Sequence, residues 1–190
     1  MTPAPDDACR PELTVWTIGH STRPVEEFLG LLASCHIETI ADVRRFPGSR
    51  KYPQYGQEAL AATLAQHAIG YHWLQALGGR RPVSPDSPNV TWRNASFRGY
   101  ADYMASAGFA QGLEQLLELA RRSRTTLMCA EAVWWRCHRS MIADALCARG
   151  VKVLHIMDDN HVTLHPMTSP ARIVGGHLTY LPLDSAAAAQ

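Results

Sequence analysis

The hydrophobic pattern of the chain alternates between short apolar runs and longer stretches with helical periodicity. The apolar runs, rich in β-branched and aromatic residues, predict five strands over residues 13–19, 38–43, 70–74, 124–129 and 151–157. Apolar residues that recur at helical spacing predict four helices over residues 24–35, 58–68, 100–122 and 139–148, the third with a break near Gly108. Strands separated by helices are typical of βαβ units. We therefore expect a three-layer α/β fold, with a mostly parallel sheet of about five strands and helices on both faces.

The remaining segments complete this expectation. Residues 162–164 and 176–180 predict a small C-terminal hairpin or extra edge strands. The chain length suits a single domain, which we expect over residues 13–183, between flexible tails at residues 1–12 and 184–190. A long irregular stretch over residues 75–98 contains glycines and prolines, and loops of this length are usually functional or mobile.

The composition of the chain limits the classes of partner that it can be expected to bind. The formal net charge of the chain is +1, so no field of the whole protein attracts nucleic acid or membranes. The segment from Arg44 to Arg98, however, contains eight basic residues and only two acidic ones. This local excess of positive charge favours an anionic ligand. No stretch approaches the length of a membrane span. The five cysteines are an odd number in a chain of ordinary size, and we expect reduced thiols in a cytoplasmic protein.

The most informative stretch is residues 127–140, because reactive side chains crowd between the end of a predicted strand and the start of a predicted helix. It carries Cys129, Glu131, Cys137, His138 and Arg139. Helix N-termini attract anions. The stretch therefore predicts a site but leaves its reaction open.

Other predicted strands also end in polar residues. His20 and Ser21 follow the first strand, Asp42 and Arg44 lie at the end of the second, and Gly78 and Gly79 come shortly after the third. In an open parallel sheet, ligands bind beyond the carboxyl ends of the strands. We therefore expect these residues to share one cleft with the stretch over residues 127–140.

Three chemistries fit this set of residues. In the first, Arg139 and Ser140 bind a phosphate at the helix start, with Arg44 and Arg98 as further clamps; the Cys-to-Arg spacings do not match those of cysteine phosphatases. In the second, Glu131 and Asp42 form a carboxylate pair that cleaves a glycosidic bond. The third is a metal ion bound by thiols and an imidazole; its ligands would be Cys129, Cys137 and His138.

The ordered motifs resemble a family called domain of unknown function 488. The matching runs are Thr17–Ser21, Asp42–Arg44 with Pro47–Ser49, Leu77–Gly79, Phe97–Met104, Cys129–Glu131 and Cys137–Ser140, within residues 13–181. The motif residues of the family map onto His20, Ser21, Asp42, Arg44, Gly78, Gly79, Tyr100, Cys129, Glu131, Cys137, His138 and Arg139. Relatives often carry proline where this chain has Trp134, so the rigidity of that loop differs. The resemblance implies no activity.

The leading hypothesis is an enzyme of hydrolase or transferase type that acts on an anionic, phosphorylated or nucleotide-like substrate at the carboxyl edge of the sheet. The candidate catalytic residues are Glu131, Asp42, His20, Cys129 and Cys137. The candidate anion-binding residues are Arg44, Arg98, Arg139, Ser140, Ser21 and His138. Gly78, Gly79, Tyr100 and Trp134 are candidates for shaping the loops around the substrate.

Two alternatives stay open. The basic stretch is interleaved with aromatic residues, among them Phe46, Tyr55 and Trp92, which is typical of a nucleic-acid-binding or repair-associated module without catalysis. A thiol redox or metal-binding protein would instead use Cys129 and Cys137. We expect no cofactor in the leading case and no membrane partner.

Overall fold

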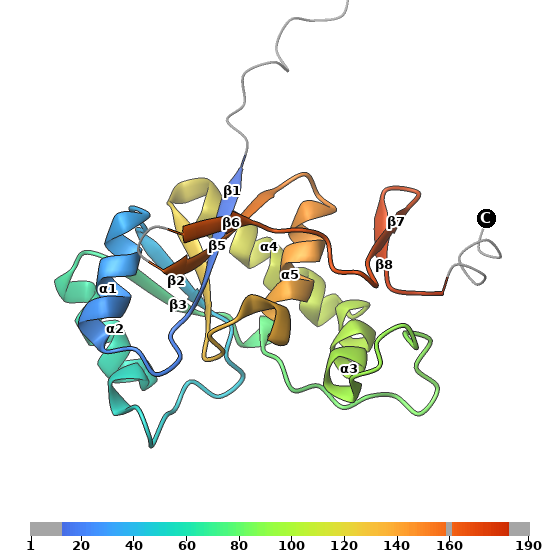
Figure 1. The fold of residues 1–190 in the computed structure, drawn as a ribbon, viewed down its shortest axis with the longest axis horizontal. Coiled ribbons are helices and arrows are strands. Elements are labelled where there is room, and N and C mark those ends of the chain that lie inside the picture. Colours follow the sequence, from blue (N-terminus) through green and yellow to red (C-terminus); the bar gives the residue numbers. More distant parts are fainter. Residues whose placement is uncertain (1–12, 159–160, 183–190) are drawn as a thin grey trace, which may run out of the picture.

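A six-stranded sheet in the order β3-β2-β4-β1-β5-β6 forms the centre of the computed structural model, which describes residues 13–158 and 161–182 (Figure 1). Its strands are β1 (Thr14–Gly19), β2 (Thr39–Asp42), β3 (Gly70–Trp73), β4 (Thr125–Cys129), β5 (Lys152–Asp158) and β6 (His161–Leu164). β1 to β5 pair in parallel, and only the edge strand β6 pairs antiparallel, with β5. The α/β prediction is confirmed, with one more strand in the sheet than expected.

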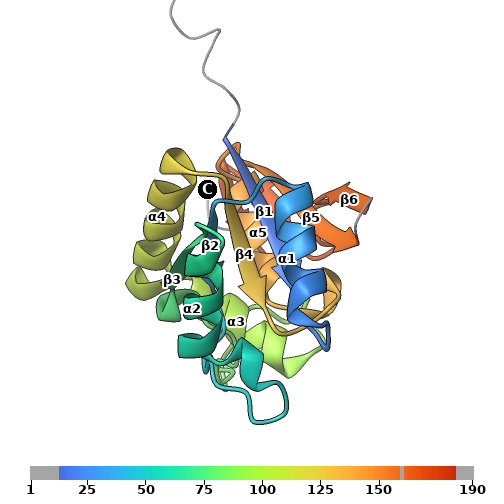
Figure 2. The ribbon, with the colours of Figure 1, turned by 90° about the vertical axis from the view of Figure 1, so that its left-hand side faces the viewer.

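Helices cover both faces of the sheet (Figure 2). They are α1 (Val25–Ser34), α2 (Gln57–Gln66), α3 (Ala95–Met104), α4 (Ala107–Arg122) and α5 (Arg139–Cys147). Alternate residues of a strand point to opposite faces, and β1 shows the consequence. Val15 packs in the cluster that contains α4 and α5, whereas Trp16 and Ile18 pack in the cluster that contains α1 and α2.

The central position of β4 explains its composition. Every residue of β4 is buried, because helices cover both faces and β2 and β1 flank its edges. Buried parallel strands read as continuous apolar runs rather than alternating ones. The last residue of this strand is Cys129, so a thiol stands at the carboxyl end of the middle of the sheet.

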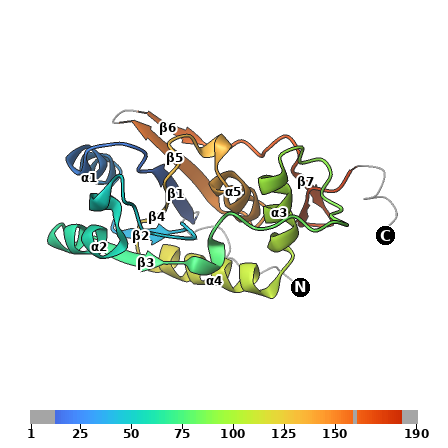
Figure 3. The same cartoon turned by 90° about the horizontal axis from the view of Figure 1, so that it is seen from below.

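The C-terminal segments divide between the two forms that the sequence left open. Residues 162–164 belong to the edge strand β6, whereas β7 (Arg172–Val174) and β8 (His177–Thr179) form a separate antiparallel hairpin (Figure 3). The sequence pattern did not predict β7.

Capping side chains determine two helix boundaries that the hydrophobic periodicity of the sequence did not predict. The Asn94 side chain accepts from two backbone N–H groups, so α3 begins five residues earlier than expected, within the stretch predicted as a loop. The Ser106 side chain accepts from the Phe109 N–H, so the break between α3 and α4 lies just before Gly108. Short 3-10 turns add η1 (Pro53–Tyr55), η2 (Gln75–Leu77) and η3 (Trp134–Arg136).

The long stretch over residues 75–98 is fixed to α3 rather than free. The Tyr100 hydroxyl donates to the Leu77 carbonyl, and the Tyr103 hydroxyl donates to the Ala76 carbonyl, both at 2.7 Å. The Asp102 carboxylate accepts from the Ser87 hydroxyl and the Asn89 amide. These bonds hold the stretch against the face of the molecule that carries the site.

The two predicted tails, residues 1–12 and 184–190, lie outside the described residues. Among residues 13–158 and 161–182, no helix has the length and apolar character that crossing a membrane requires.

Candidate active site

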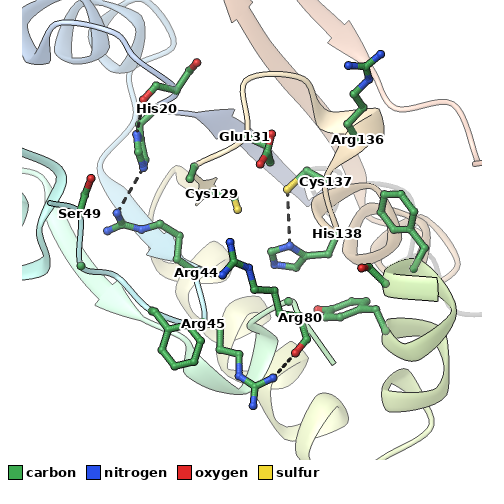
Figure 4. A pocket seen from close by; sticks show the side chains of 18 of the residues that line it. His20, Arg44, Arg45, Ser49, Arg80, Cys129, Glu131, Arg136, Cys137 and His138 are labelled. Atoms are coloured by element: carbon green, nitrogen blue, oxygen red, sulfur yellow. Dashed lines mark hydrogen bonds between the residues drawn. The ribbon is translucent and has the colours of Figure 1, made fainter. Parts of the chain in front are cut away.

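A cleft of about 670 Å³ opens at the carboxyl ends of three adjacent strands, β2, β4 and β1 (Figure 4). His20 and Ser21 reach it from β1, Arg44 and Arg45 from β2, and Cys129 from β4. Gly79 and Arg80 line it from the stretch after η2, and Tyr100 from α3. The expected convergence of the strand ends is therefore present in the structure.

The end of β1 lies directly against the chain that leaves β4. The His20 N–H donates to the Cys129 carbonyl at 3.0 Å, and the Ser21 N–H donates to the Ala130 carbonyl at 2.9 Å. A Cβ atom on Gly19 would lie 1.9 Å from the Glu131 carbonyl oxygen, so only glycine permits this approach. Ser21 itself has a φ of 50°, an uncommon backbone conformation for a residue other than glycine.

Cys137 is a thiol of the cleft that lies between two nitrogen donors. Its sulfur accepts a hydrogen bond from Arg139 Nε at 3.3 Å and lies 3.7 Å from His138 Nδ1. Burial alone would raise the pKa of the Cys137 thiol. A hydrogen bond from the Cys129 thiol and the positive charges of His138 and Arg139 outweigh burial and hold this pKa well below its ordinary value.

Cys129 has the opposite character. Its hydrogen bond to Cys137 and its burial raise the pKa of the Cys129 thiol well above the ordinary value. A thiol that donates to a neighbouring sulfur must keep its proton, because the proton makes the bond. The two cysteines therefore form an asymmetric pair, in which the surroundings favour the thiolate at Cys137 and the protonated thiol at Cys129.

His138 is held in one orientation by its surroundings. Its Nε2 lies 3.0 Å from the Val43 carbonyl oxygen, which can only accept, so Nε2 carries a proton. The other ring nitrogen, Nδ1, faces Cys137. A Cβ atom on Gly79 would lie 2.8 Å from Nδ1, and Tyr100 packs against the ring at 5.1 Å between centroids. Gly79 and Tyr100 thus shape the wall that fixes the imidazole.

Arg139 and Ser140 hold the backbone of the loop that carries Cys137. Arg139 is only 1% exposed, and besides the Cys137 sulfur it donates to the carbonyl oxygens of Glu131 and Ala132. The Ser140 hydroxyl donates to the Cys137 carbonyl. Neither residue lines the cleft. Both were expected to bind the anion, but their donors already hold the loop over residues 131–137.

Asp42 also lies behind the cleft. Its carboxylate is fully buried, and it accepts from Arg44 Nε and NH2 and from the Tyr71 hydroxyl, the last two at 2.6 Å. Asp42 is absent from the cleft lining, which does include Glu131. The structure therefore does not present these two carboxylates to one substrate.

His20 is fixed through both ring nitrogens. Arg44 NH1 donates toward Nε2 at 3.4 Å, and Nδ1 lies 3.0 Å from the Ser21 carbonyl, while the ring stacks on Tyr55 at 4.1 Å. Burial, followed by the charge of Arg44, lowers the pKa of His20 to about 4. The imidazole is neutral at pH 7 and serves as part of the wall.

Two arginines of the cleft were not among the site residues selected from the sequence. Arg45 and Arg80 line the cleft, and the Arg80 guanidinium extends toward the two sulfurs (Figure 4). Arg45 NH1 donates to the Arg80 carbonyl, and Arg80 has a φ of 57°. Arg136 lies at the rim, with its guanidinium directed away from the sulfurs. Among the described residues these three guanidiniums form no salt bridge, and Glu131 is the only carboxylate of the lining.

Three expected residues lie elsewhere. Arg98 donates to the Trp92 carbonyl, and Gly78 packs against the backbone of Arg45, where a Cβ would come within 2.9 Å. The indole of Trp134 stacks on His155 at 4.3 Å, away from the cleft. Trp134 therefore anchors η3, the turn that leads into Cys137.

A family model described as Domain of unknown function DUF488 matches residues 24–146. The chain belongs to this family. The matched segment contains Arg44, Cys129 and the stretch from Cys137 to Arg139, whereas His20 and Ser21 precede it. No match was found among curated proteins or among solved structures. Membership of the family thus supports the resemblance and gives no activity.

Three side chains of the cleft in this family member have the chemistry of soft-metal ligands. The sulfurs of Cys129 and Cys137 and a ring nitrogen of His138 all lie within 4.8 Å of one another. Thiolate and imidazole donors suit ions such as Zn²⁺ or Cu⁺, and a tetrahedral ion would need a fourth donor. The expectation that the protein needs no cofactor stays a prediction.

Proposed function

We propose that the protein is an enzyme of hydrolase or transferase type in which the Cys137 thiolate attacks an anionic substrate held in the cleft. One observation carries this proposal: the Cys137 sulfur accepts a hydrogen bond from Arg139 Nε within a cleft whose free charges are mostly guanidiniums. A thiolate is the reactive form of cysteine, and neighbouring cations increase its population.

The Cys137–His138 pair supplies the elements of nucleophilic catalysis. When the Cys137 proton passes to His138 Nδ1, the imidazolium lies 3.7 Å from the thiolate, and Nε2 stays anchored on the Val43 carbonyl. The start of α5 immediately follows and adds the positive end of a helix dipole. Attack by the thiolate forms a covalent bond to the substrate and expels a leaving group, to which the imidazolium can return the proton.

The charge of the cleft supports an anionic substrate. Arg44 is already neutralised by Asp42, which leaves Arg45 and Arg80 as the unpaired guanidiniums inside the cleft, with Arg136 at its rim and Glu131 as the one carboxylate of the lining. Arginine is suited to bidentate recognition of carboxylate and phosphate groups. In this proposal Arg45 and Arg80 hold the anion, and the exposed Glu131 carboxylate activates the water or acceptor that releases the product.

Alkylation of Cys137 by two reagents that differ in charge tests both parts of the proposal. Iodoacetate is an anion and iodoacetamide is neutral, so the ratio of their rate constants reports the potential at the sulfur. We expect a ratio for Cys137 at least about tenfold above that of free cysteine, measured by mass spectrometry of the Cys137 peptide. Arg45→Gln and Arg80→Gln should each lower the ratio.

The control for these variants is Arg121→Gln, which removes an exposed arginine at the end of α4 and should leave the ratio unchanged. An unreactive Cys137 in the folded protein would overturn the nucleophile. A ratio equal to that of free cysteine would overturn the anionic substrate.

A further inference from the structure

A second sulfur directly beside the nucleophile is unexplained by a reaction that needs one thiol. Cys129 and Cys137 offer their sulfurs within 4.8 Å of each other, although they are eight positions apart in the sequence. Both side chains are almost fully buried among protein atoms, yet both line the cleft. A substrate bound there meets both sulfurs.

We propose that Cys129 is a resolving thiol and that the cleft reduces anionic disulfides by thiol–disulfide exchange. This inference rests on the proposed function only in that Cys137 is the attacking thiolate, and it assigns the same site a second reaction, the reduction of a disulfide. The geometry that supports it is the placement of the two sulfurs within 4.8 Å of each other in an arginine-lined cleft (Figure 4).

The reaction balances in two exchange steps. The Cys137 thiolate attacks one sulfur of a disulfide R–S–S–R, which forms a mixed disulfide and releases R–S⁻. The Cys129 thiol then passes its proton to the first R–S⁻ and attacks the Cys137 sulfur, which forms the Cys129–Cys137 disulfide and releases the second R–S⁻. A low-molecular-weight dithiol returns the protein to its reduced form and is itself oxidised.

The surroundings of the two thiols fit these two roles. Arg139 Nε donates to the Cys137 sulfur at 3.3 Å, which favours Cys137 as the attacking thiolate. The Cys129 sulfur lies within 4.8 Å of the Cys137 sulfur, so Cys129 is the neighbouring thiol that can attack a mixed disulfide formed there.

The two cysteines belong to different elements that meet at the cleft. Cys129 ends β4, in register with Gly19 of β1, whereas Cys137 follows η3. The other described cysteines do not line the cleft: Cys35 caps the end of α1, and Cys147 ends α5. Among the described cysteines, a disulfide within the cleft therefore joins Cys129 to Cys137.

The test uses 5,5′-dithiobis(2-nitrobenzoate), an anionic aromatic disulfide that releases a coloured thiolate. The full chain carries Cys9→Ser, Cys35→Ser and Cys147→Ser, so that only the two cleft thiols react. We expect two coloured thiolates per chain, the second released in a step whose rate does not depend on reagent concentration. Peptide mapping should then find Cys129 joined to Cys137.

Two variants separate the steps. Cys129→Ser in this background should release one coloured thiolate and retain the other half of the reagent on Cys137. Cys129→Ala is a second replacement without a hydroxyl and should behave in the same way, with circular dichroism as the check of folding. Replacing the reagent by neutral 2,2′-dithiodipyridine should slow the first step relative to the anionic reagent, after correction for the rates with free cysteine.

The outcomes distinguish this inference from the proposed function. A stable mixed disulfide on Cys137 in the protein with both thiols, with one coloured thiolate released, would overturn the resolving role and leave the nucleophile intact. A folded protein in which Cys137 does not react would overturn both. Two thiolates released with each sulfur carrying its own adduct would also overturn the resolving role.

Discussion

Two buried arginines that the sequence places near the site have different partners and therefore different roles. Arg44 forms an ion pair with the carboxylate of Asp42, so its charge is neutralised within the fold. Arg139 has no carboxylate partner among the described residues and donates to a sulfur and to carbonyl oxygens. A guanidinium without an acidic partner stabilises an anion beside it, and in the proposed function that anion is the Cys137 thiolate.

Removing the Asp42 charge should mainly destabilise the fold. Breaking a fully buried ion pair from one side leaves an uncompensated charge, so Asp42→Asn should lower the free energy of unfolding by about 3 kcal/mol. Glu27→Gln, which breaks the exposed pair with Arg23, should cost less than about 1 kcal/mol. Urea unfolding measures both, and equal effects would contradict the structural role of Asp42.

Acid should destabilise the protein through His20. Its pKa is about 4 in the folded protein, against an ordinary 6.5, because of burial and then the charge of Arg44; Asp42, Arg139 and the Ser21 carbonyl also face the ring. The unfolded chain thus binds more protons between these values, so stability is complete above pH 6.5 and is lost as pH falls toward 4. His155, whose burial lowers its pKa to about 3, adds a loss in the same direction.

Unfolding in urea at pH 7 and at pH 4.5 measures this loss. His20→Gln should reduce the difference between the two pH values, by up to about 3 kcal/mol. The exposed His67 is the matched control, and His67→Gln should leave the difference unchanged. A difference that is the same in the wild type and in His20→Gln would contradict this role of His20.

The sequence predicted the thiols of the site better than its cations. Cys129, Cys137 and His138 could be found because they lie next to a predicted strand end and a predicted helix start. Arg45 and Arg80 could not be selected from their neighbours, because the paths of their loops follow from contacts such as Tyr100 with Leu77 rather than from periodicity. The excess of basic residues between Arg44 and Arg98 was the only sequence signal for them.

At the scale of elements, the site depends on the close approach of β1 to the chain that leaves β4. Gly19 is the contact point, and the loop over residues 131–137 is held from the other side by Arg139 and by Trp134 on His155. Several fixed anchors on one short loop are the means by which Cys137 reaches the cleft with its sulfur oriented.

Gly19→Ala should displace this loop. The new Cβ would lie within 2.9 Å of two carbonyl oxygens, those of Glu131 and Ala132, so the loop must move away. We expect Cys137 alkylation by iodoacetamide to slow at least about tenfold and the free energy of unfolding to fall by about 1–3 kcal/mol.

Gly30→Ala provides the control within α1, because nothing lies within 4 Å of its added Cβ. It should raise stability by about 0.5–1 kcal/mol and leave the alkylation rate of Cys137 unchanged. Equal alkylation rates in the two variants would show that the approach at Gly19 does not position the thiol.

Elements with a strong period were predicted well, and short or capped ones were not. The inner strands β1, β2 and β4 were found because buried strands form continuous apolar runs, and β3 and β5 because they are rich in β-branched and aromatic residues. The three residues of β7 carry no such run, since Arg172 and Ile173 are exposed and the hairpin is defined by its pairing with β8. The early start of α3 depends on the Asn94 cap, and the hydrophobic periodicity carries no information about this cap.

At the scale of the whole molecule, the net charge is small, but positive charge is concentrated at the cleft. The chain has a formal net charge of +1, while the cleft combines four guanidiniums with one carboxylate. Attraction of an anion should therefore be local to the cleft and screened by salt, because the Debye length is about 8 Å at physiological ionic strength.

This concentration of charge predicts how salt acts on alkylation. Raising the salt concentration should slow the reaction of Cys137 with iodoacetate by about three- to tenfold and leave the reaction with iodoacetamide unchanged. Equal effects on the two reagents would show that salt acts on the fold rather than on the cleft.

A single-stranded oligonucleotide distinguishes the enzyme from a nucleic-acid-binding module. We expect no binding that grows with oligonucleotide length at physiological salt, since the four arginines on which the proposed anion site depends lie within one bounded cleft. Tight binding that weakens steeply with salt, seen by fluorescence anisotropy, would favour the module instead.

The charge state of Cys137 decides the account most directly. The ultraviolet absorbance of the thiolate, taken as the difference between wild type and Cys137→Ser across a pH titration, measures it in the intact protein. The account predicts a midpoint well below the ordinary thiol value of about 8.5, shifted upward in Arg139→Met. A midpoint at or above that ordinary value in the folded wild type would contradict it.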